Sequence, residues 1–178
     1  NKTASQLEGS KIFTKKLCKK YNIPTSKFEI FENKDDAIKY LDNSKYPIVI
    51  KADGLASGKG VYICKSNNEA KNAVSEIFDG KFGKADCVLV EEFLNGEEMS
   101  YFIISDGKEY KSFQTAQDHK RVGEGDTGPN TGGMGSYSPS RLSNKNLEAK
   151  INKKIIEPTL AGLKKLNTEY VGFLYVGL

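Results

Sequence analysis

The sequence contains no long apolar run. Its longest apolar stretches are short ones such as IVI at 48–50 and VLV at 88–90, far below the roughly 20 residues that a membrane-spanning helix needs. The opening NKTASQLEGSK contains neither the apolar core of a signal peptide nor an initiating methionine. These absences predict a cytoplasmic protein, or a piece of one, without a transmembrane segment.

Cysteine is scarce and scattered. Cys18, Cys64 and Cys87 are odd in number, lie among apolar or helical neighbours, and lack the spacing of metal ligands. A disulfide framework is therefore disfavoured, and we expect reduced, mostly buried thiols.

A strong excess of charge of one sign is also missing. The net charge of +4 is mild for a nucleic-acid-binding protein, and the basic residues are spread along the chain instead of gathered in one stripe. The chain also lacks an RNA-binding aromatic motif. We therefore expect no nucleic-acid partner, but a surface that tolerates anionic small molecules.

Hydrophobic periodicity and turn residues predict alternating helices and strands. Asn33 is a plausible helix cap, and Ser66 with Glu69 has the spacing of a capping box. The dipeptide Asp106-Gly107 suggests a hairpin. The expected helices are 4–21, 34–41, about 67–78 and about 145–166, the last kinked at Pro158. The expected strands are 27–31, 46–52, 61–64, 87–93, 97–105, 109–114 and 170–178.

The segment KADGLASGKG at 51–60 combines lysines with closely spaced glycines, a composition suited to cradling phosphates. It is not a Walker loop, because three residues separate Gly54 from Gly58 and Gly60 follows Lys59 where Ser or Thr should stand. It also leads into a strand instead of a helix. We interpret it as a flap between two strands, with Lys51 on the first and Lys59 at the tip; a flexible surface hairpin is the alternative.

The segment VLVEEFLNGEE at 88–98 ends an apolar strand with acids and an aromatic. It offers apolar walls and backbone hydrogen bonds for a purine, and an acceptor for ribose hydroxyls. Taken alone, its four glutamates also fit a solvated surface.

The stretch DHKRVGEGDTGPNTGGMG at 118–135 has no hydrophobic period and contains the only histidine of the chain. We expect it to be a long loop, and such loops in compact domains are usually functional or disordered. His119, Lys120 and Arg121 suit anions, Asp126 suits an ammonium group, and the glycines allow close backbone approach to a substrate. A mobile linker is the alternative, although linkers seldom carry so mixed a set of side chains.

These segments, in this order, resemble the ATP-grasp ligases, and among them the phosphoribosylamine-glycine ligases. The similarity lies in KADGLASGKGV, EEFLNGEE, QDHKRVGEGDTGPNTGGMGSYSP and GFLYVGL, and it runs from QLEGSK onward. It implies an α+β, ATP-grasp fold that is truncated at both ends. A leading helix at 1–27 would precede a small lid subdomain at 28–93 and an incomplete, larger antiparallel-sheet subdomain at 94–178, with the family's N-terminal and C-terminal domains absent.

The resemblance also implies a reaction. ATP would drive ligation of glycine to 5-phosphoribosylamine through a glycyl phosphate, giving glycinamide ribonucleotide, ADP and phosphate in purine biosynthesis. The implied cofactors are ATP and Mg²⁺ or Mn²⁺, with metal ligands beyond Leu178, so we expect little activity from the isolated chain. Another ATP-grasp carboxylate-amine ligase, and a non-catalytic nucleotide-binding module, are the alternatives.

Site residues follow from the matching motifs. Lys11 and Lys51 would contact the phosphates beneath the flap, Glu91 to Leu94 would hold the adenine edge, and Glu98 would bind the ribose. The full set implied to bind ATP is Lys11, Lys51, Asp53, Gly54, Gly58, Lys59, Gly60, Val61, Glu91, Glu92, Phe93, Leu94 and Glu98. The residues implied to be catalytic are His119, Lys120, Arg121 and Asp126, and those implied to bind glycine and phosphoribosylamine are Asp126, Pro129, Asn130, Thr131, Gly132, Gly133, Met134 and Gly135.

Overall fold

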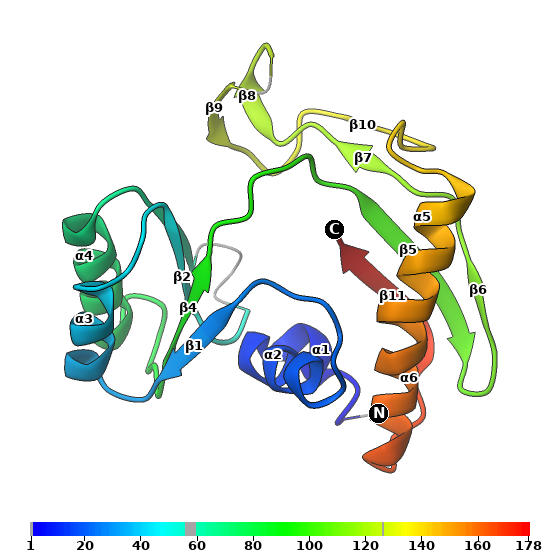
Figure 1. The fold of residues 1–178 in the computed structure, drawn as a ribbon, viewed down its shortest axis with the longest axis horizontal. Helices are drawn as coiled ribbons and strands as arrows, with labels where there is room; N and C mark the ends of the chain where they lie inside the picture. Colours follow the sequence, from blue (N-terminus) through cyan, green and yellow to red (C-terminus); the bar gives the residue numbers. More distant parts are fainter. Residues whose placement is uncertain (1, 56–59, 126) are drawn as a thin grey trace. The chain divides into compact units, whose positions relative to one another are not determined.

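The computed structural model describes residues 2–55, 60–125 and 127–178. The described residues form two compact units, Lys2–Asn95 and Gly96–Leu178, coloured from blue to green and from green to red in Figure 1. Each unit has its own antiparallel sheet.

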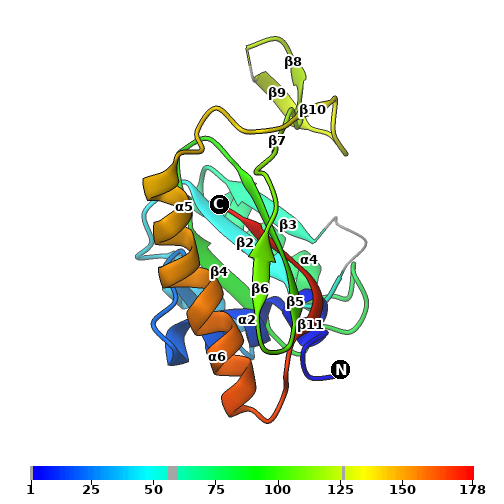
Figure 2. The same cartoon turned by 90° about the vertical axis from the view of Figure 1, so that its right-hand side faces the viewer.

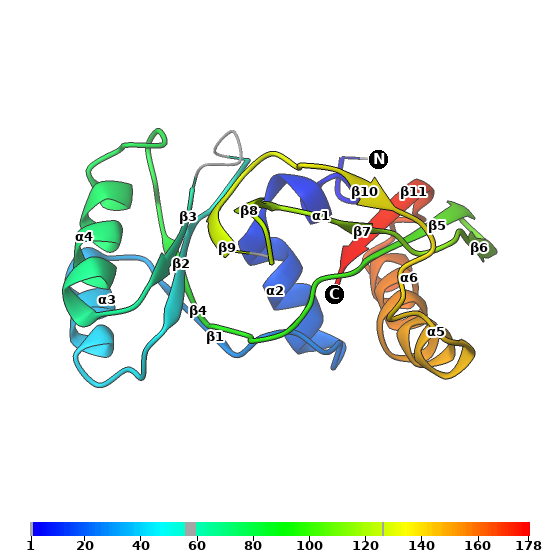
Figure 3. The ribbon, with the colours of Figure 1, turned by 90° about the horizontal axis from the view of Figure 1, so that it is seen from above.

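The unit Lys2–Asn95 is built on a four-stranded sheet in the order β1-β4-β2-β3. Helices α3 and α4 cover one face of this sheet, and α1 and α2 lie on the other side (Figures 1 and 3). The strands are β1 (Phe28–Phe31), β2 (Ile48–Ala52), β3 (Val61–Cys64) and β4 (Val88–Glu92), and the helices are α1 (Gln6–Gly9), α2 (Lys11–Lys20), α3 (Lys34–Leu41) and α4 (Asn67–Phe78).

Alternation along the strands decides which residues meet helices α3 and α4. Ile48, Ile50 and Val90 are buried in one cluster with residues of both helices. Because successive side chains of a strand point to opposite faces, Lys51 and Glu91 lie on the other face. The apolar core thereby fixes where these two charged groups stand.

The predicted caps of α3 and α4 are confirmed. Asn33 Oδ1 accepts a hydrogen bond of 2.9 Å from the Asp36 amide, and Ser66 Oγ accepts one of 3.3 Å from the Glu69 amide. Glu69 Oε2 accepts a 2.8 Å hydrogen bond from the amide of Lys65 instead of from that of Ser66. These local hydrogen bonds satisfy backbone donors of the first turns, which have no partner within the helix.

The single helix predicted over 4–21 is wrong. Ser10 has φ −141° and ψ 114°, which is extended backbone, and it separates α1 from α2. Its Oγ accepts a 3.0 Å hydrogen bond from the Phe13 amide and so caps α2. Lys11 is therefore the first residue of a new helix.

The unit Gly96–Leu178 contains a three-stranded sheet in the order β11-β5-β6. The hairpin predicted at Asp106-Gly107 is confirmed: Asp106 Oδ1 accepts 2.8 Å hydrogen bonds from the amides of Lys108 and Glu109. One face of the sheet packs on a long helical segment (Figure 2). Tyr101 Oη of the sheet donates a 2.9 Å hydrogen bond to Asn152 Oδ1 of this segment. The strands are β5 (Ser100–Asp106), β6 (Tyr110–Ser112) and β11 (Val171–Gly177).

The predicted long helix is present, but its irregularity precedes Pro158. It consists of α5 (Lys145–Ile151), a π-helical segment η2 (Asn152–Ile156) and α6 (Glu157–Lys165). Proline has no N–H to donate and its ring crowds the carbonyl four residues earlier, so the turn before Pro158 is wider than an α-helical turn. Thr159 Oγ1 donates a 2.6 Å hydrogen bond to the Ile155 carbonyl beside it.

The prediction of one long loop at 118–135 is wrong, because the described part of this stretch contains strands of a two-stranded ribbon (Figure 1). Backbone hydrogen bonds join His119 N to Gly135 O and Met134 N to His119 O, at 2.8 and 2.7 Å. A Cβ on Gly123 would lie 2.6 Å from Thr127 Oγ1, so this position needs glycine. The paired strands are β7 (Gln117–Asp118) with β10 (Ser136–Tyr137), and β8 (Arg121–Gly123) with β9 (Thr127–Asn130).

The three cysteines are free, as predicted: Cys64 is buried and Cys18 and Cys87 are half-buried. Burial raises the pKa of the Cys64 thiol to about 11, which disfavours the reactive thiolate. Across residues 2–55, 60–125 and 127–178, no helix is both long and apolar enough to cross a membrane.

Candidate functional site

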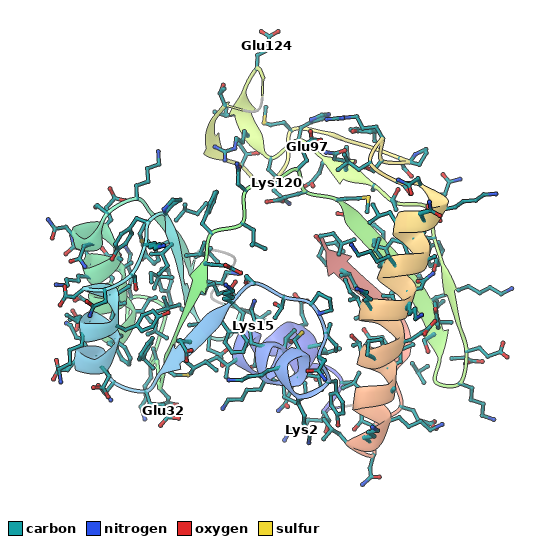
Figure 4. The ribbon with its side chains drawn as sticks, viewed as in Figure 1. Lys2, Lys15, Glu32, Glu97, Lys120 and Glu124 are labelled. Carbon is teal, nitrogen blue, oxygen red and sulfur yellow. The ribbon has the colours of Figure 1, made fainter. Side chains whose placement is uncertain are left out.

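A buried carboxylate with two lysines is the electrostatic centre of the unit Lys2–Asn95. Glu91 is 5% exposed, and its Oε2 lies 3.1 Å from Lys51 Nζ and 3.3 Å from Lys15 Nζ. Ser26 Oγ donates to the same oxygen at 2.7 Å. Lys15, which belongs to α2, is labelled in Figure 4. We call Lys15, Ser26, Lys51 and Glu91 the Glu91 cluster.

The sheet register brings Lys51 and Glu91 together. On paired strands β2 and β4, Lys51 stands opposite Leu89 and Val49 opposite Glu91. Lys51 and Glu91 are therefore diagonal neighbours on one face, a separation that long side chains can span.

Removing these charges from water is costly, and their attraction only partly offsets that cost. Burial lowers the pKa of the Lys15 ammonium, while the charge of Glu91 opposes that change. Among the described residues, Glu91 Oε1 is a buried oxygen without a hydrogen-bond partner. The cluster thus keeps one free acceptor, which is unusual for a buried carboxylate.

The start of α2 is joined to the residues that open the flap. The Asp53 carboxylate accepts hydrogen bonds of 3.0 and 3.1 Å from Ser10 Oγ and one of 3.1 Å from the Ile12 amide. Lys11 Nζ donates to the Gly54 carbonyl at 2.5 Å. Asp53 therefore binds the positive end of α2, a role that the sequence did not indicate.

Three lysines approach one another in this unit. Burial lowers the pKa of Lys11; Asp53 opposes the change, and the charge of Lys51 adds to it. With Lys15 they form a group of three lysines, and Glu91 and Asp53 are carboxylates that interact with their charges. Such a site favours an anionic ligand.

The described part of the flap is the base of a hairpin. The Ala52 amide donates to the Gly60 carbonyl at 2.9 Å, and Lys51 pairs with Val61 across β2 and β3. Gly54 has φ +82°, which favours glycine. Gly58 and Lys59, both predicted to bind phosphate, lie outside the described residues.

A pocket of about 590 Å³ lies at the end of the sheet, beside the segment predicted to hold adenine. Its walls include Ile48 and Val90 from the helix-packed face, together with Glu91. Within the predicted segment, Glu92 Oε1 accepts a 2.7 Å hydrogen bond from the Lys27 amide. Phe93 also lines the pocket, whereas Leu94 is 66% exposed.

In the unit Gly96–Leu178, three of the predicted catalytic residues, His119, Lys120 and Arg121, lie along the ribbon. Lys120 Nζ is 2.7 Å from Asp118 Oδ2, which raises the pKa of Lys120. The His119 ring stacks on Tyr137, with ring centroids 5.7 Å apart. His119 and Lys120 lie between β7 and β8. Arg121 Nη1 donates to the Gly128 carbonyl at 3.2 Å.

The predicted substrate residues form the returning strand of the ribbon and its turn. Thr131 Oγ1 donates to the Lys120 carbonyl at 2.8 Å and accepts from the Gly133 amide at 3.0 Å. Met134 is 59% exposed, and it lies between Gly133 and Gly135, which both have positive φ. The backbone of Pro129 and Asn130 belongs to β9, Gly132 is exposed, and Asp126 lies outside the described residues.

Charged residues near the start of this unit differ in their surroundings. Glu97 makes hydrogen bonds of 2.6 and 2.5 Å with Arg141 Nη2. Glu98, predicted to bind ribose, is exposed and contributes to the raised pKa of Lys120. Among residues 2–55, 60–125 and 127–178, no group of three or more His, Cys, Asp or Glu could hold a metal ion.

Sequence reasoning missed Ser10, Lys15 and Ser26. Lys15 follows Lys11 by four residues, a spacing that places both on one side of a helix. This was a usable signal, but a lysine on an amphipathic helix is far more often at the solvent-exposed surface.

Lysines around a buried acid, beside a glycine-rich flap between antiparallel strands, define an ATP-grasp domain. Residues 9–178 match the family model described as phosphoribosylglycinamide synthetase, ATP-grasp (A) domain. The chain belongs to this family. Phosphoribosylamine-glycine ligase from Thermotoga maritima has a similar structure, with a TM-score of 0.89 and 39% identity over 98% of this chain and 44% of that one.

Other relatives agree with this assignment. The chain is 50% identical to phosphoribosylamine-glycine ligase of Mesorhizobium japonicum over 100% of this chain and 42% of the relative. It is 51% identical to the chloroplastic phosphoribosylamine-glycine ligase of Arabidopsis thaliana, over 98% of this chain and 33% of the relative. The D-alanine-D-alanine ligase of Coxiella burnetii shares the fold, with a TM-score of 0.70 at 17% identity over 99% of this chain and 44% of that one. The chain thus spans less than half the length of these relatives.

Proposed function

We propose that this chain is the ATP-binding part of a phosphoribosylamine-glycine ligase. The protein that contains it would join glycine to 5-phosphoribosylamine in the cytoplasm, producing glycinamide ribonucleotide, ADP and phosphate for purine biosynthesis. The observation that carries the proposal is the convergence of Lys11, Lys15 and Lys51 beside Glu91, at the base of the glycine-rich flap.

ATP binding is assigned mainly to the unit Lys2–Asn95. Lys11 and Lys51 contact the phosphates, and the flap from Gly54 to Gly60 covers them. Adenine lies against residues 91–94. Glu98 accepts hydrogen bonds from the ribose hydroxyls.

The reaction has two steps. An oxygen of the glycine carboxylate attacks the γ-phosphorus of ATP. The bond between this phosphorus and the oxygen that bridges it to the β-phosphate breaks, so that ADP leaves and glycyl phosphate is formed. The amine of phosphoribosylamine then attacks the glycyl carbonyl carbon, loses a proton, and displaces phosphate. Phosphorylation is needed because a free carboxylate is a poor acyl donor.

The residues of this chain act by positioning and by neutralising charge. Lys11 and Lys51 hold the phosphates in line with the attacking carboxylate, a requirement of phosphoryl transfer. His119, Lys120 and Arg121 on the ribbon stabilise the transferring phosphoryl and the acyl phosphate. Asp126 binds the glycine ammonium group, and residues 129–135 shape the pocket for both substrates.

Mg²⁺ or Mn²⁺ would neutralise charge on the ATP phosphates when bound. No group of three or more His, Cys, Asp or Glu that could hold such an ion is found among the described residues, and we assign no step of the reaction to it. We expect its ligands in residues outside this chain, and we expect little turnover from the 178 residues alone.

Phosphate release by the natural protein that contains these residues tests the proposal. The reaction should require ATP, glycine and phosphoribosylamine, and omission of any one should abolish phosphate release above background. Unchanged release without glycine would exclude this ligase. Release that requires glycine but not phosphoribosylamine would indicate a different amine acceptor.

A further inference from the structure

Two lysines share one carboxylate in the Glu91 cluster, but they are held very differently. Lys15 Nζ lies 2.6 Å from Thr25 Oγ1, 2.7 Å from Ser26 Oγ and 3.3 Å from Glu91 Oε2. It also lies 5.4 Å from the centre of the Phe28 ring, and its side chain is 11% exposed. An ammonium group has three donors, and those of Lys15 all face protein oxygens.

Lys51 is held less firmly. Its ammonium lies 3.1 Å from Glu91 Oε2, and its side chain is 26% exposed. Within the part of the chain that the structure describes, Glu91 is its only hydrogen-bond partner. Lys51 can therefore change partner without disturbing the surrounding packing.

We propose that Lys15 is a positioning residue, the fixed counter-ion of Glu91, and that it allows Lys51 to leave Glu91 and bind the nucleotide phosphates. This inference rests on the proposed function and adds a residue and a mechanism to it. Without Lys15, transfer of Lys51 to a phosphate would leave a buried carboxylate unpaired, which is strongly unfavourable. Lys51 would then stay on Glu91, and the affinity for ATP would fall.

Direct contact of Lys15 with phosphate is the competing explanation. The geometry favours the counter-ion role, because the donors of Lys15 are already directed at Thr25, Ser26 and Glu91. The two explanations make different predictions once the carboxylate of Glu91 is removed.

The experiment is a double-mutant cycle on ATP affinity, measured by calorimetry with Mg²⁺ and without glycine, in the natural protein that contains this chain. We expect Lys15→Met to weaken ATP binding at least tenfold. In a Glu91→Gln background there is no buried charge to compensate, so adding Lys15→Met should change affinity less than twofold. Lys16→Met is the matched control, because Lys16 is the exposed neighbour on α2, and it should bind ATP like the wild type.

Each other outcome is decisive. Wild-type affinity in Lys15→Met overturns the inference, and an undiminished loss in the Glu91→Gln background assigns Lys15 to the phosphates instead. Absence of ATP binding by the wild type overturns the proposed function itself. If Lys15→Met does not fold, the ATP affinities of Glu91→Gln and of the double variant still distinguish the two explanations. Lys15→Arg adds a further test, because it keeps the charge and should therefore keep wild-type affinity.

Discussion

The Glu91 cluster and the ribbon at 117–137 both carry charged residues assigned to the same reaction, but they are built in opposite ways. In the cluster, side chains hold one another in a buried setting, and Glu91 is 5% exposed. In the ribbon, backbone hydrogen bonds set the shape, and the Lys120 and Asp118 side chains are 40% and 29% exposed. Loss of a charge should therefore destabilise the first region and leave the fold of the second intact.

Glu91→Ala tests this difference with the largest expected effect. Removing the Glu91 carboxylate leaves the ammonium groups of Lys15 and Lys51 partly buried without a counter-ion. Breaking a buried pair in this way costs about 3–5 kcal/mol. Urea denaturation should show a loss of this size in the free energy of unfolding. A loss below about 1 kcal/mol would mean that water already screens the cluster.

Lys51→Ala should separate binding from stability within the cluster. Lys15 still neutralises Glu91 in this variant, so we expect a smaller loss of unfolding free energy than in Glu91→Ala. ATP affinity should fall about a hundredfold, because truncating a charged hydrogen-bonding partner typically costs 2–5 kcal/mol. Calorimetric titration with ATP measures this effect, and Lys65→Ala, at an exposed position after β3, serves as the control. Full retention of ATP affinity would remove Lys51 from the phosphate site.

Asp53→Ala should have an intermediate effect. Asp53 accepts hydrogen bonds from Ser10 Oγ, whose own oxygen caps α2, and from the Ile12 amide; loss of a side-chain acceptor at a helix N-terminus costs about 0.5–2 kcal/mol. ATP affinity should fall only indirectly, because Lys11 at the start of α2 is then held less firmly. If ATP binding were lost while thermal stability was unchanged, Asp53 would be a direct ligand, as the motif first suggested.

Local chemistry made part of this fold predictable. The caps at Asn33 and Ser66 and the hairpin at Asp106 were correct because each depends on residues within a few positions. The break at Ser10 was missed because a lone serine in a polar helix is a weak signal, and its bond to Asp53 depends on chain folding. The ribbon was missed because its register comes from backbone pairing of His119 with Gly135, which leaves no hydrophobic period.

The candidate site shows the same limit. The motifs indicated Lys51 and Glu91, but they did not indicate that these residues pair with each other or that Lys15 joins them. Burial of a lysine depends on what packs against it, and sequence periodicity describes only the helix that carries it. Charged groups enclosed by contacts between distant segments are therefore the part of such a site that sequence reasoning misses most easily.

Lys120→Met should give the smallest change in stability and sharpens the comparison most directly. Its ion pair with Asp118 is substantially exposed, and pairs of this kind contribute about 0–1 kcal/mol, so the unfolding free energy should stay within about 0.5 kcal/mol of the wild type. ATP affinity should change less than in Lys51→Ala, whereas phosphate release in the complete reaction should fall steeply, because the ribbon is assigned to the transferring phosphoryl. A variant at exposed Lys111 controls for the loss of one surface charge. Normal turnover in Lys120→Met would place the catalytic charge elsewhere on the ribbon. A large loss of unfolding free energy would show that side chains, and not only the backbone, hold the ribbon together.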